Sequence, residues 1–150
     1  ISKETSIHLA RLTHQYYIDP KSFILYDDAL FTLKYLSSKG WKNVILSNHV
    51  PELPQIVEQL GLDPLISNCI SSATIGYEKP HPEAFKIALS ASGNPKFVWM
   101  VGDSISADII GAQNVNIPAI LVHNSKTDNI KYHANALKDV IDIIENQRYS

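Results

Sequence analysis

Cysteine is almost absent from this sequence, since Cys69 is the only one among 150 residues. A single cysteine cannot form an internal disulfide, and no set of cysteines and histidines has the spacing of a zinc site. No apolar run is long enough to cross a bilayer, and the first residues lack the pattern of a signal peptide. These absences favour a reducing, cytoplasmic compartment and no membrane partner.

Neither sign of charge dominates, because the sequence has 13 basic and 15 acidic residues and a formal net charge of -2. The lysines and arginines are scattered, so the chain has no basic footprint for nucleic acid. The hydrophobic fraction of 45% and the charged fraction of 19% are typical of a globular protein. A chain of this length is enough for one domain with its own core. The composition leaves the oligomeric state open.

Apolar runs alternate with amphipathic stretches along most of the chain. Residues 3–17 are expected to form a helix that ends before Pro20, and the composition changes near Tyr26. After that point, Asp27 or Asp28 is suited to cap a helix that carries Leu30 on its apolar face and ends at Gly40. Further helices are expected over residues 53–60, 82–89, 109–112 and 137–144, and strands over residues 44–46, 66–71, 97–101 and 119–122.

This alternation of strands and helices predicts an α/β fold, a Rossmann-like parallel sheet with helices on both faces. Parallel strands of such a sheet end at the same edge, and ligands bind beyond their carboxyl ends. Polar residues that directly follow the expected strands are therefore the candidates for function.

Two acids follow the strand that is expected over residues 97–101. Asp103 stands at the tip of this strand, after the flexible Gly102, and Asp108 comes five residues later at the start of a helix. Two carboxylates at this spacing suit Mg²⁺, which takes oxygen ligands. The spacing is equally well explained if Asp103 merely ends a strand and Asp108 complements a helix dipole.

Ser47 and Lys79 stand at two other strand-to-helix connections. The hydroxyl of Ser47 is suited to donate a hydrogen bond to a phosphoryl oxygen, although a lone serine there is more often a turn former. Lys79 offers a positive charge for a phosphate, although taken alone it reads as a solvated lysine. Pro80 holds Lys79 in an extended conformation.

The segments ILSN, GYEKPHPEAF and VGDSISADIIGA, in this order and separation, resemble the second, third and fourth motifs of the haloacid dehalogenase (HAD) superfamily. The resemblance covers residues 26–122 and extends towards the C-terminus. It implies that Ser47 binds the transferring phosphoryl group with help from the Asn48 amide, and that Lys79 stabilises the charge on nucleophile and phosphate. Asp103 matches the magnesium ligand of the fourth motif, and Asp108 matches its second acid.

The activity that the resemblance implies is that of a magnesium-dependent phosphatase of small phosphorylated metabolites. A strand-end aspartate attacks phosphorus to form an aspartyl-phosphate, and a second aspartate two residues later acts as general acid and then as base. The alternatives are a phosphomutase or dehalogenase of the same superfamily, and a catalytically inactive HAD-like binding domain. His49 and His81 follow the second and third motifs and could reach the substrate, although residues in such places are more often neighbouring or surface groups.

The first motif of this superfamily, two aspartates separated by one residue, has no match in the chain. Asp27 and Asp28 are adjacent and open a helix instead. The strand that carries the motif would lie between the strands that end at Ser47 and Asp103. We therefore expect a segment upstream of Ile1 to supply it, so that residues 26–150 form a core without its first strand. Residues 1–25 are then the remnant of a helical cap, or otherwise an ordinary N-terminal helix.

Overall fold

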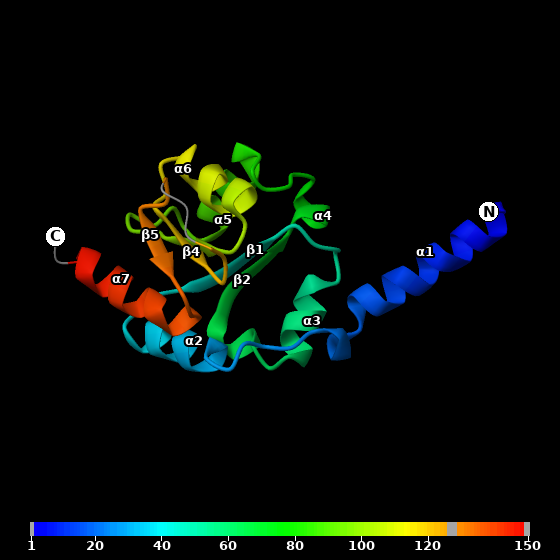
Figure 1. The fold of residues 1–150 in the computed structure, drawn as a ribbon, viewed down its shortest axis with the longest axis horizontal. Helices are drawn as coiled ribbons and strands as arrows, with labels where there is room; N and C mark the ends of the chain where they lie inside the picture. Colours follow the sequence, from blue (N-terminus) through cyan, green and yellow to red (C-terminus); the bar gives the residue numbers. More distant parts are fainter. Residues whose placement is uncertain (1, 126–128, 149–150) are drawn as a thin grey trace.

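The computed structural model describes residues 2–125 and 129–148, and these form an α/β domain with one projecting helix (Figure 1). The strands are β1 (Asn43–Ser47), β2 (Ile66–Ser71), β3 (Met100–Gly102), β4 (Ala119–Val122) and β5 (Tyr132–Ala134). The helices are α1 (Lys3–Ile18), α2 (Ala29–Ser38), α3 (Leu53–Gln59), α4 (Ser72–Ile75), α5 (Pro82–Ala91), the π-helix η3 (Ile105–Ile110), α6 (Gly111–Gln113) and α7 (Val140–Arg148). Short 3₁₀ turns cover Pro20–Ser22, Asp63–Leu65 and Leu137–Asp139.

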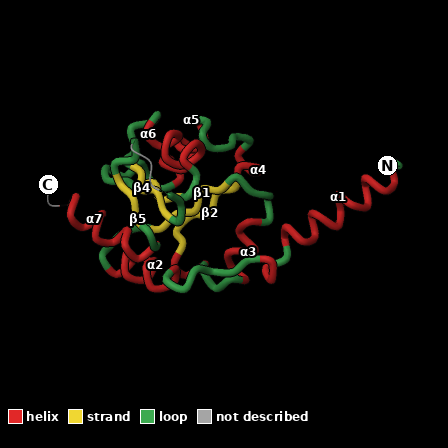
Figure 2. Tube along the Cα trace, viewed as in Figure 1, coloured by secondary structure: helices red, strands yellow, loops and turns green. Residues whose placement is uncertain are grey.

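All strand pairs are parallel, as the sequence predicts, but they form two sheets rather than one (Figure 2). The first sheet pairs β1 with β2, and the second has the order β3-β4-β5. In the described part of the chain no strand joins β1 to β3. Each of these two strands therefore has one edge that is paired and one that is free.

Helices cover both faces of the β3-β4-β5 sheet, and β4 explains why. Its four residues are all buried, and successive side chains point to opposite faces. Ile120 and Val122 pack with the α2 and α7 side, whereas Ala119 and Leu121 pack with the α5, η3 and α6 side. Figure 1 shows α2 and α7 below the strands and α5 and α6 above them. The predicted α/β fold with helices on both faces is confirmed.

Several element boundaries differ from those that the sequence predicts. The strand expected over residues 97–101 begins only at Met100, and Phe97 is 71% exposed. Strand β5, which contains His133, is not among the strands that the sequence predicts. Leu30 is exposed, because α2 buries Ala29, Thr32 and Leu36 instead.

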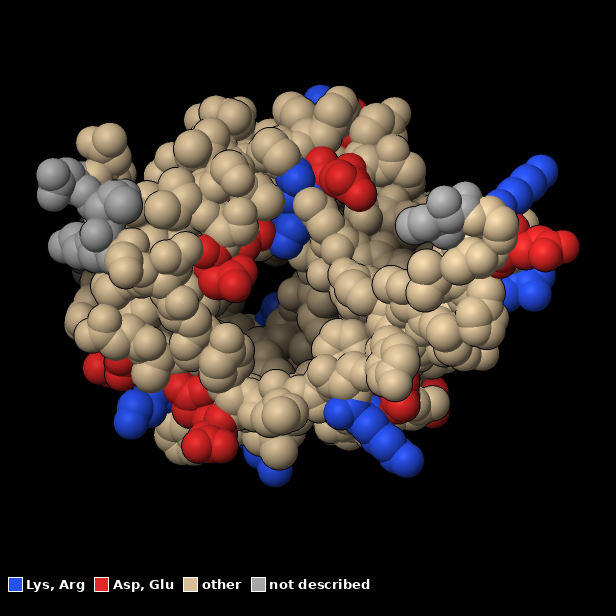
Figure 3. Space-filling model, turned by 45° about the vertical axis from the view of Figure 1, so that its right-hand side comes forward, with Lys and Arg blue, Asp and Glu red and all other residues tan. Residues whose placement is uncertain are grey.

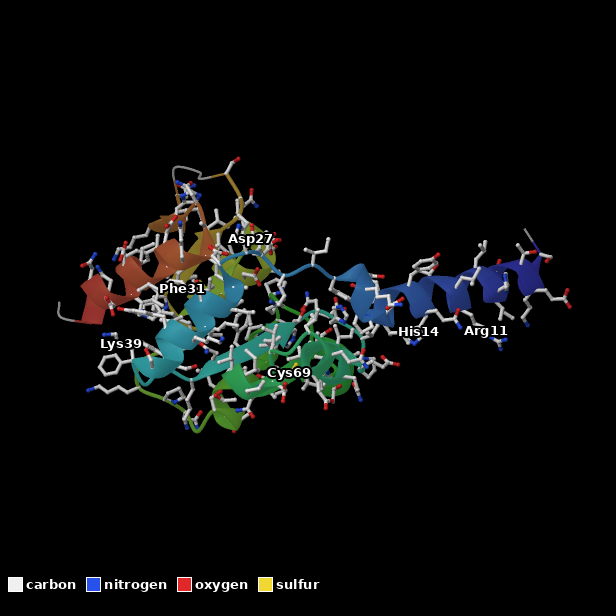
Figure 4. All side chains as sticks on the ribbon, turned by 90° about the horizontal axis from the view of Figure 1, so that it is seen from below. Arg11, His14, Asp27, Phe31, Lys39 and Cys69 are labelled. Atoms are coloured by element: carbon white, nitrogen blue, oxygen red, sulfur yellow. The ribbon has the colours of Figure 1, made fainter. Side chains whose placement is uncertain are left out.

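Helix α1 extends away from the rest of the molecule, as Figures 1 and 4 show. None of the residues from Lys3 to Ile18 is buried. Its contacts with the domain lie near its C-terminal end, where the Tyr17 ring stacks on His49 at 4.7 Å and His14 lies 3.3 Å from Glu52. The assignment of residues 1–25 to a cap stays a prediction. No helix among the described residues is both long and apolar enough to span a membrane.

Candidate active site

The side chain of Asn48 holds both backbone polar groups of Lys79. Asn48 directly follows β1, and its Oδ1 accepts a hydrogen bond of 2.8 Å from the backbone N–H of Lys79. Its Nδ2 donates a hydrogen bond of 2.9 Å to the carbonyl oxygen of the same lysine. This paired contact fixes the loop before α5 against the tip of the first sheet.

The ammonium group of Lys79 is held from the other sheet. Its Nζ lies 2.7 Å from Asp108 Oδ1, and the side chains of Lys79 and Asp108 are only 11% and 6% exposed. Asp108 Oδ2 accepts a hydrogen bond of 3.0 Å from the backbone N–H of Ser104. Since Asn48 follows β1 and Asp108 follows β3, the Asn48–Lys79–Asp108 cluster connects the two sheets.

The connection after β3 brings Asp108 back to the end of that strand. Ser104 caps η3, because its Oγ accepts a hydrogen bond of 3.1 Å from the N–H of Ala107. A Cβ atom at Gly102 would collide with the Asp108 carboxylate. The glycine therefore serves a close approach of the acid to the backbone, in addition to the tight turn that the sequence predicts.

Asp103 and Ser47 differ from this cluster because their side chains are uncommitted. The carboxylate of Asp103 is exposed and makes no ion pair or hydrogen bond within the described chain. The backbone carbonyl oxygen of Asp103 accepts a hydrogen bond of 2.8 Å from Asn124 Nδ2. The Ser47 hydroxyl likewise forms no hydrogen bond to any described residue. Both groups remain available to a ligand.

The five predicted site residues thus form a directly bonded part and a free part. Asn48 contacts Lys79, and Lys79 in turn contacts Asp108. Asp103 directly precedes Ser104, whose backbone N–H donates to Asp108, and Ser47 directly precedes Asn48. Among the described residues no group of three or more acidic, histidine or cysteine side chains gathers to hold a metal. The free carboxylate of Asp103 suits Mg²⁺ in kind, but the set of oxygen ligands is incomplete in number.

The backbone of His49, next to this cluster, is fixed by buried serines that the sequence did not reveal. The backbone N–H of His49 donates a hydrogen bond of 3.1 Å to Ser72 Oγ. The Ser71 hydroxyl donates hydrogen bonds to the carbonyl oxygens of His49 and Val50. Ser71 and Ser72 end β2 and open α4, where two serines in a row carry no functional signature. Their burial is a consequence of the β1–β2 pairing, which sequence alone does not supply.

The two histidines that flank the motifs have different surroundings. Burial lowers the pKa of His49, and the charge of Glu52 opposes that shift only in part. The His49 ring contacts both Tyr17 and Phe23, and the centroids of the His49 and Phe23 rings are 5.7 Å apart. His81 instead caps α5, since its Nδ1 accepts a hydrogen bond of 3.2 Å from the N–H of Glu83.

The face of the molecule in Figure 3 is hollowed at its centre, and basic and acidic side chains stand at the rim of the hollow. Figure 4 places Asp27 at the start of α2, and Asp28 occupies the N-cap position as expected, but the Asp28 side chain makes no capping hydrogen bond. The carboxylate of Asp28 accepts a hydrogen bond of 2.9 Å from the N–H of Lys138.

The chain is thus a parallel α/β domain with polar side chains gathered at the carboxyl ends of its strands, where such domains bind their ligands. A sequence model described as haloacid dehalogenase-like hydrolase matches residues 3–116. The chain therefore belongs to the haloacid dehalogenase-like hydrolase family.

Characterised relatives and solved structures agree with this assignment. The chain is 32% identical over 105 residues to a glyceraldehyde 3-phosphate phosphatase of Methanothermobacter thermautotrophicus, covering 68% of this chain and 46% of that protein. It is 31% identical over 115 residues to a phosphoserine phosphatase of Thermus thermophilus, covering 74% and 45%. A crystal structure of a HAD phosphatase from Thermococcus onnurineus superposes with a TM-score of 0.78 at 25% identity, covering 89% and 63%. The chain spans about half the length of such curated relatives.

Proposed function

We propose that this protein is a magnesium-dependent phosphatase of small phosphorylated metabolites that acts through an aspartyl-phosphate intermediate. The observation that carries the proposal is the position of Lys79. Its backbone is held by Asn48 and its ammonium group by Asp108, so that a positive charge is fixed where two strand ends meet. Preorganised charges of this kind stabilise a transferring phosphoryl group without reorganisation during the reaction.

The nucleophile is proposed to reside on a further parallel strand between β1 and β3. Both strands have a free edge, and they belong to separate sheets. A parallel strand placed between them would pair with both free edges and join the two sheets. The first of two aspartates on that strand attacks phosphorus, and the second acts as general acid and then as base.

The residues of this chain have distinct roles in the proposed site. The Ser47 hydroxyl donates to a phosphoryl oxygen, and the Asn48 amide orients Lys79 beside the phosphate. Asp103 would hold Mg²⁺ through its free carboxylate, with Asp108 contributing its remaining lone pairs directly or through a water. The metal would supply positive charge to the phosphoryl oxygens. Asp108 also keeps the Lys79 ammonium group in place.

The relatives support a small phosphorylated substrate. Those named above act, by their names, on glyceraldehyde 3-phosphate and on phosphoserine. Helix α1 is proposed to belong to a cap over the site, because Leu9, Leu12 and Tyr16 are exposed at 49%, 39% and 72% with no core to cover them. A cap of this kind would select the organic part of the substrate.

The test is hydrolysis of p-nitrophenyl phosphate by the complete protein, with and without magnesium. Asp103→Asn is expected to raise the magnesium concentration for half-maximal activity and to lower turnover at least about 100-fold, since one oxyanion or metal contact typically contributes that much. Asp63→Asn is the matched control, because this acid precedes β2 at the opposite end of the strands. Acid-quenched mass spectrometry should detect one phosphoryl group on the first aspartate of the proposed strand between β1 and β3.

Each alternative predicts a different result. If the complete protein binds inorganic phosphate but hydrolyses no phosphate ester, it is a binding domain. Release of halide from a haloacid without magnesium would identify a dehalogenase, and conversion of one sugar phosphate isomer into another would identify a phosphomutase. Unchanged magnesium dependence in Asp103→Asn would remove Asp103 from the metal site.

A further inference from the structure

The peptide unit that follows Asp103 is bound by side chains on both of its edges. The carbonyl oxygen of Asp103 and the backbone N–H of Ser104 belong to this one unit. The carbonyl oxygen accepts a hydrogen bond of 2.8 Å from Asn124 Nδ2, and the N–H donates a hydrogen bond of 3.0 Å to Asp108 Oδ2. Because a peptide unit is planar, two hydrogen bonds on opposite edges fix its orientation. They also fix the point at which the Asp103 side chain leaves the backbone.

Asp103 stands where the sheet no longer holds the chain. Strand β3 ends at Gly102, which pairs with Leu121 of β4, so that Asp103 lies one residue beyond the last pair of this ladder. Glycine gives the backbone before Asp103 wide conformational freedom. Asn124 comes two residues after the end of β4, and its amide extends the contact between the two strands past the ladder.

The amide of Asn124 is itself oriented by its neighbours. Its Oδ1 accepts a hydrogen bond of 2.7 Å from the backbone N–H of Ser125, so the NH₂ group is the one that faces Asp103. The backbone carbonyl oxygen of Asn124 lies 2.8 Å from Nε2 of His133 in β5. A carbonyl oxygen only accepts, so His133 donates this bond. Side chain and backbone of Asn124 are therefore both held.

The two edges of the peptide unit have different partners with different tasks. Asp108 is buried and also lies 2.7 Å from Lys79 Nζ, so its carboxylate is shared between the lysine and the backbone. Asn124 carries no charge and makes no contact with the lysine that any bond of the described chain records. Its effect on the site is therefore geometric, and it reaches the site through Asp103.

We propose that Asn124 is a positioning residue of the metal site, which orients the carboxylate of Asp103 without contacting the ion. The inference rests on the proposed function, in which Asp103 holds Mg²⁺. Groups that orient the ligands of a metal typically contribute about 10–100-fold to metal affinity. The contribution of Asn124 requires the N–H donor of its amide, because the group that it binds is a carbonyl oxygen.

The test measures the affinity of the complete protein for Mn²⁺ by electron paramagnetic resonance without substrate, since Mn²⁺ takes the same oxygen ligands as Mg²⁺. Asn124→Leu removes the donor, keeps a similar shape and adds no charge. It should raise the dissociation constant of Mn²⁺ about tenfold. Turnover of p-nitrophenyl phosphate at saturating magnesium should stay close to that of wild type, because every proposed ligand is still present. A general loss of structure would lower turnover as well.

Two further variants show whether the effect passes through Asp103. Asn68 Nδ2 donates a similar hydrogen bond, of 3.0 Å, to the carbonyl oxygen of Ala91, and Asn68→Leu should leave the affinity for Mn²⁺ unchanged. The double variant Asn124→Leu with Asp103→Asn should bind Mn²⁺ no more weakly than Asp103→Asn alone. Two changes that act through one group are not additive.

The outcomes separate this inference from the function on which it rests. An unchanged affinity for Mn²⁺ in Asn124→Leu overturns it and leaves the proposed phosphatase intact. Equal losses in Asn124→Leu and Asn68→Leu also overturn it, and so does an additive loss in the double variant. If wild type does not bind Mn²⁺, or if Asp103→Asn binds it as tightly as wild type, the proposed metal site is wrong and the role of Asn124 is refuted with it.

Discussion

Two ion pairs of this chain have the same length and differ in burial, which makes them a matched test of the candidate site. Lys79 and Asp108 lie 2.7 Å apart with side chains that are 11% and 6% exposed. Lys86 and Glu83 also lie 2.7 Å apart, with side chains that are 60% and 41% exposed. The perturbation is the removal of one carboxylate at a time, as Asp108→Asn and as Glu83→Gln.

The buried pair should be far more sensitive. Asp108→Asn leaves the Lys79 ammonium group desolvated and without an anion, and breaking such a pair costs about 3–5 kcal/mol. In a domain of this size 1 kcal/mol corresponds to about 2–4 °C, so the melting temperature should fall by about 6–20 °C. Glu83→Gln should have no measurable effect, because water solvates both partners of that pair.

A double variant isolates the origin of this cost. Lys79→Met combined with Asp108→Leu removes both charges and leaves apolar side chains of similar volume. Stability should return most of the way to wild type, since an uncompensated buried charge no longer exists. Site chemistry would be lost even though stability returns.

The assay is thermal and urea unfolding at pH 7, in low salt and in 1 M salt. The Debye length is about 3 Å in 1 M salt, so exposed charges are screened while the buried pair keeps most of its interaction. Equal effects of Asp108→Asn and Glu83→Gln would refute the reasoning. So would a double variant that is no more stable than Asp108→Asn alone, because the unpaired charge would then not be the cause.

Three further changes have defined outcomes. Gly102→Ala should destabilise the fold by about 1–3 kcal/mol, because the added methyl group collides with the Asp108 carboxylate, and urea unfolding measures this. Burial lowers the pKa of His49, so the unfolded state binds a proton at this residue more readily than the folded state does. The free energy of unfolding should therefore fall as the pH drops below about 6.5, and it should fall less in His49→Gln. Urea titrations across pH 5–8 measure both effects. Phe85→Ala should cost about 3–5 kcal/mol, since Phe85 is fully enclosed, whereas Phe97→Ala should leave the melting temperature unaltered.

How much of the fold the sequence predicts depends on whether an element is defined by its own residues or by its neighbours. The run over residues 119–122 is apolar throughout and is a buried strand in the structure. Strand β3 is shorter than its apolar run because its pairing with β4 begins opposite Ala119, at Met100. Strand β5 is three residues long and exists because β4 offers it an edge. The local sequence pattern predicts neither the start of β3 nor the presence of β5.

The same distinction separates the two acids of the candidate site. Asp103 and Asp108 are equivalent in the sequence, as two carboxylates near the end of one strand. In the structure Asp103 is exposed and free, whereas Asp108 is buried against Lys79. The difference arises from Asn48, which comes from another sheet and brings Lys79 within reach. Spacing predicts which residues meet, but the partner of each acid is decided by long-range pairing.

Lys79 lies between the ends of two strands, β1 and β3, that belong to separate sheets. Asn48 and Asp108 approach this lysine from the tips of β1 and β3, and these two strands are not bonded to each other in the described structure. A strand between them would fix the distance between the two tips by backbone hydrogen bonds on both edges. The position of Lys79 and the continuity of the sheet would therefore be coupled, and in the proposed site a residue at the end of that strand would face the Lys79 ammonium group.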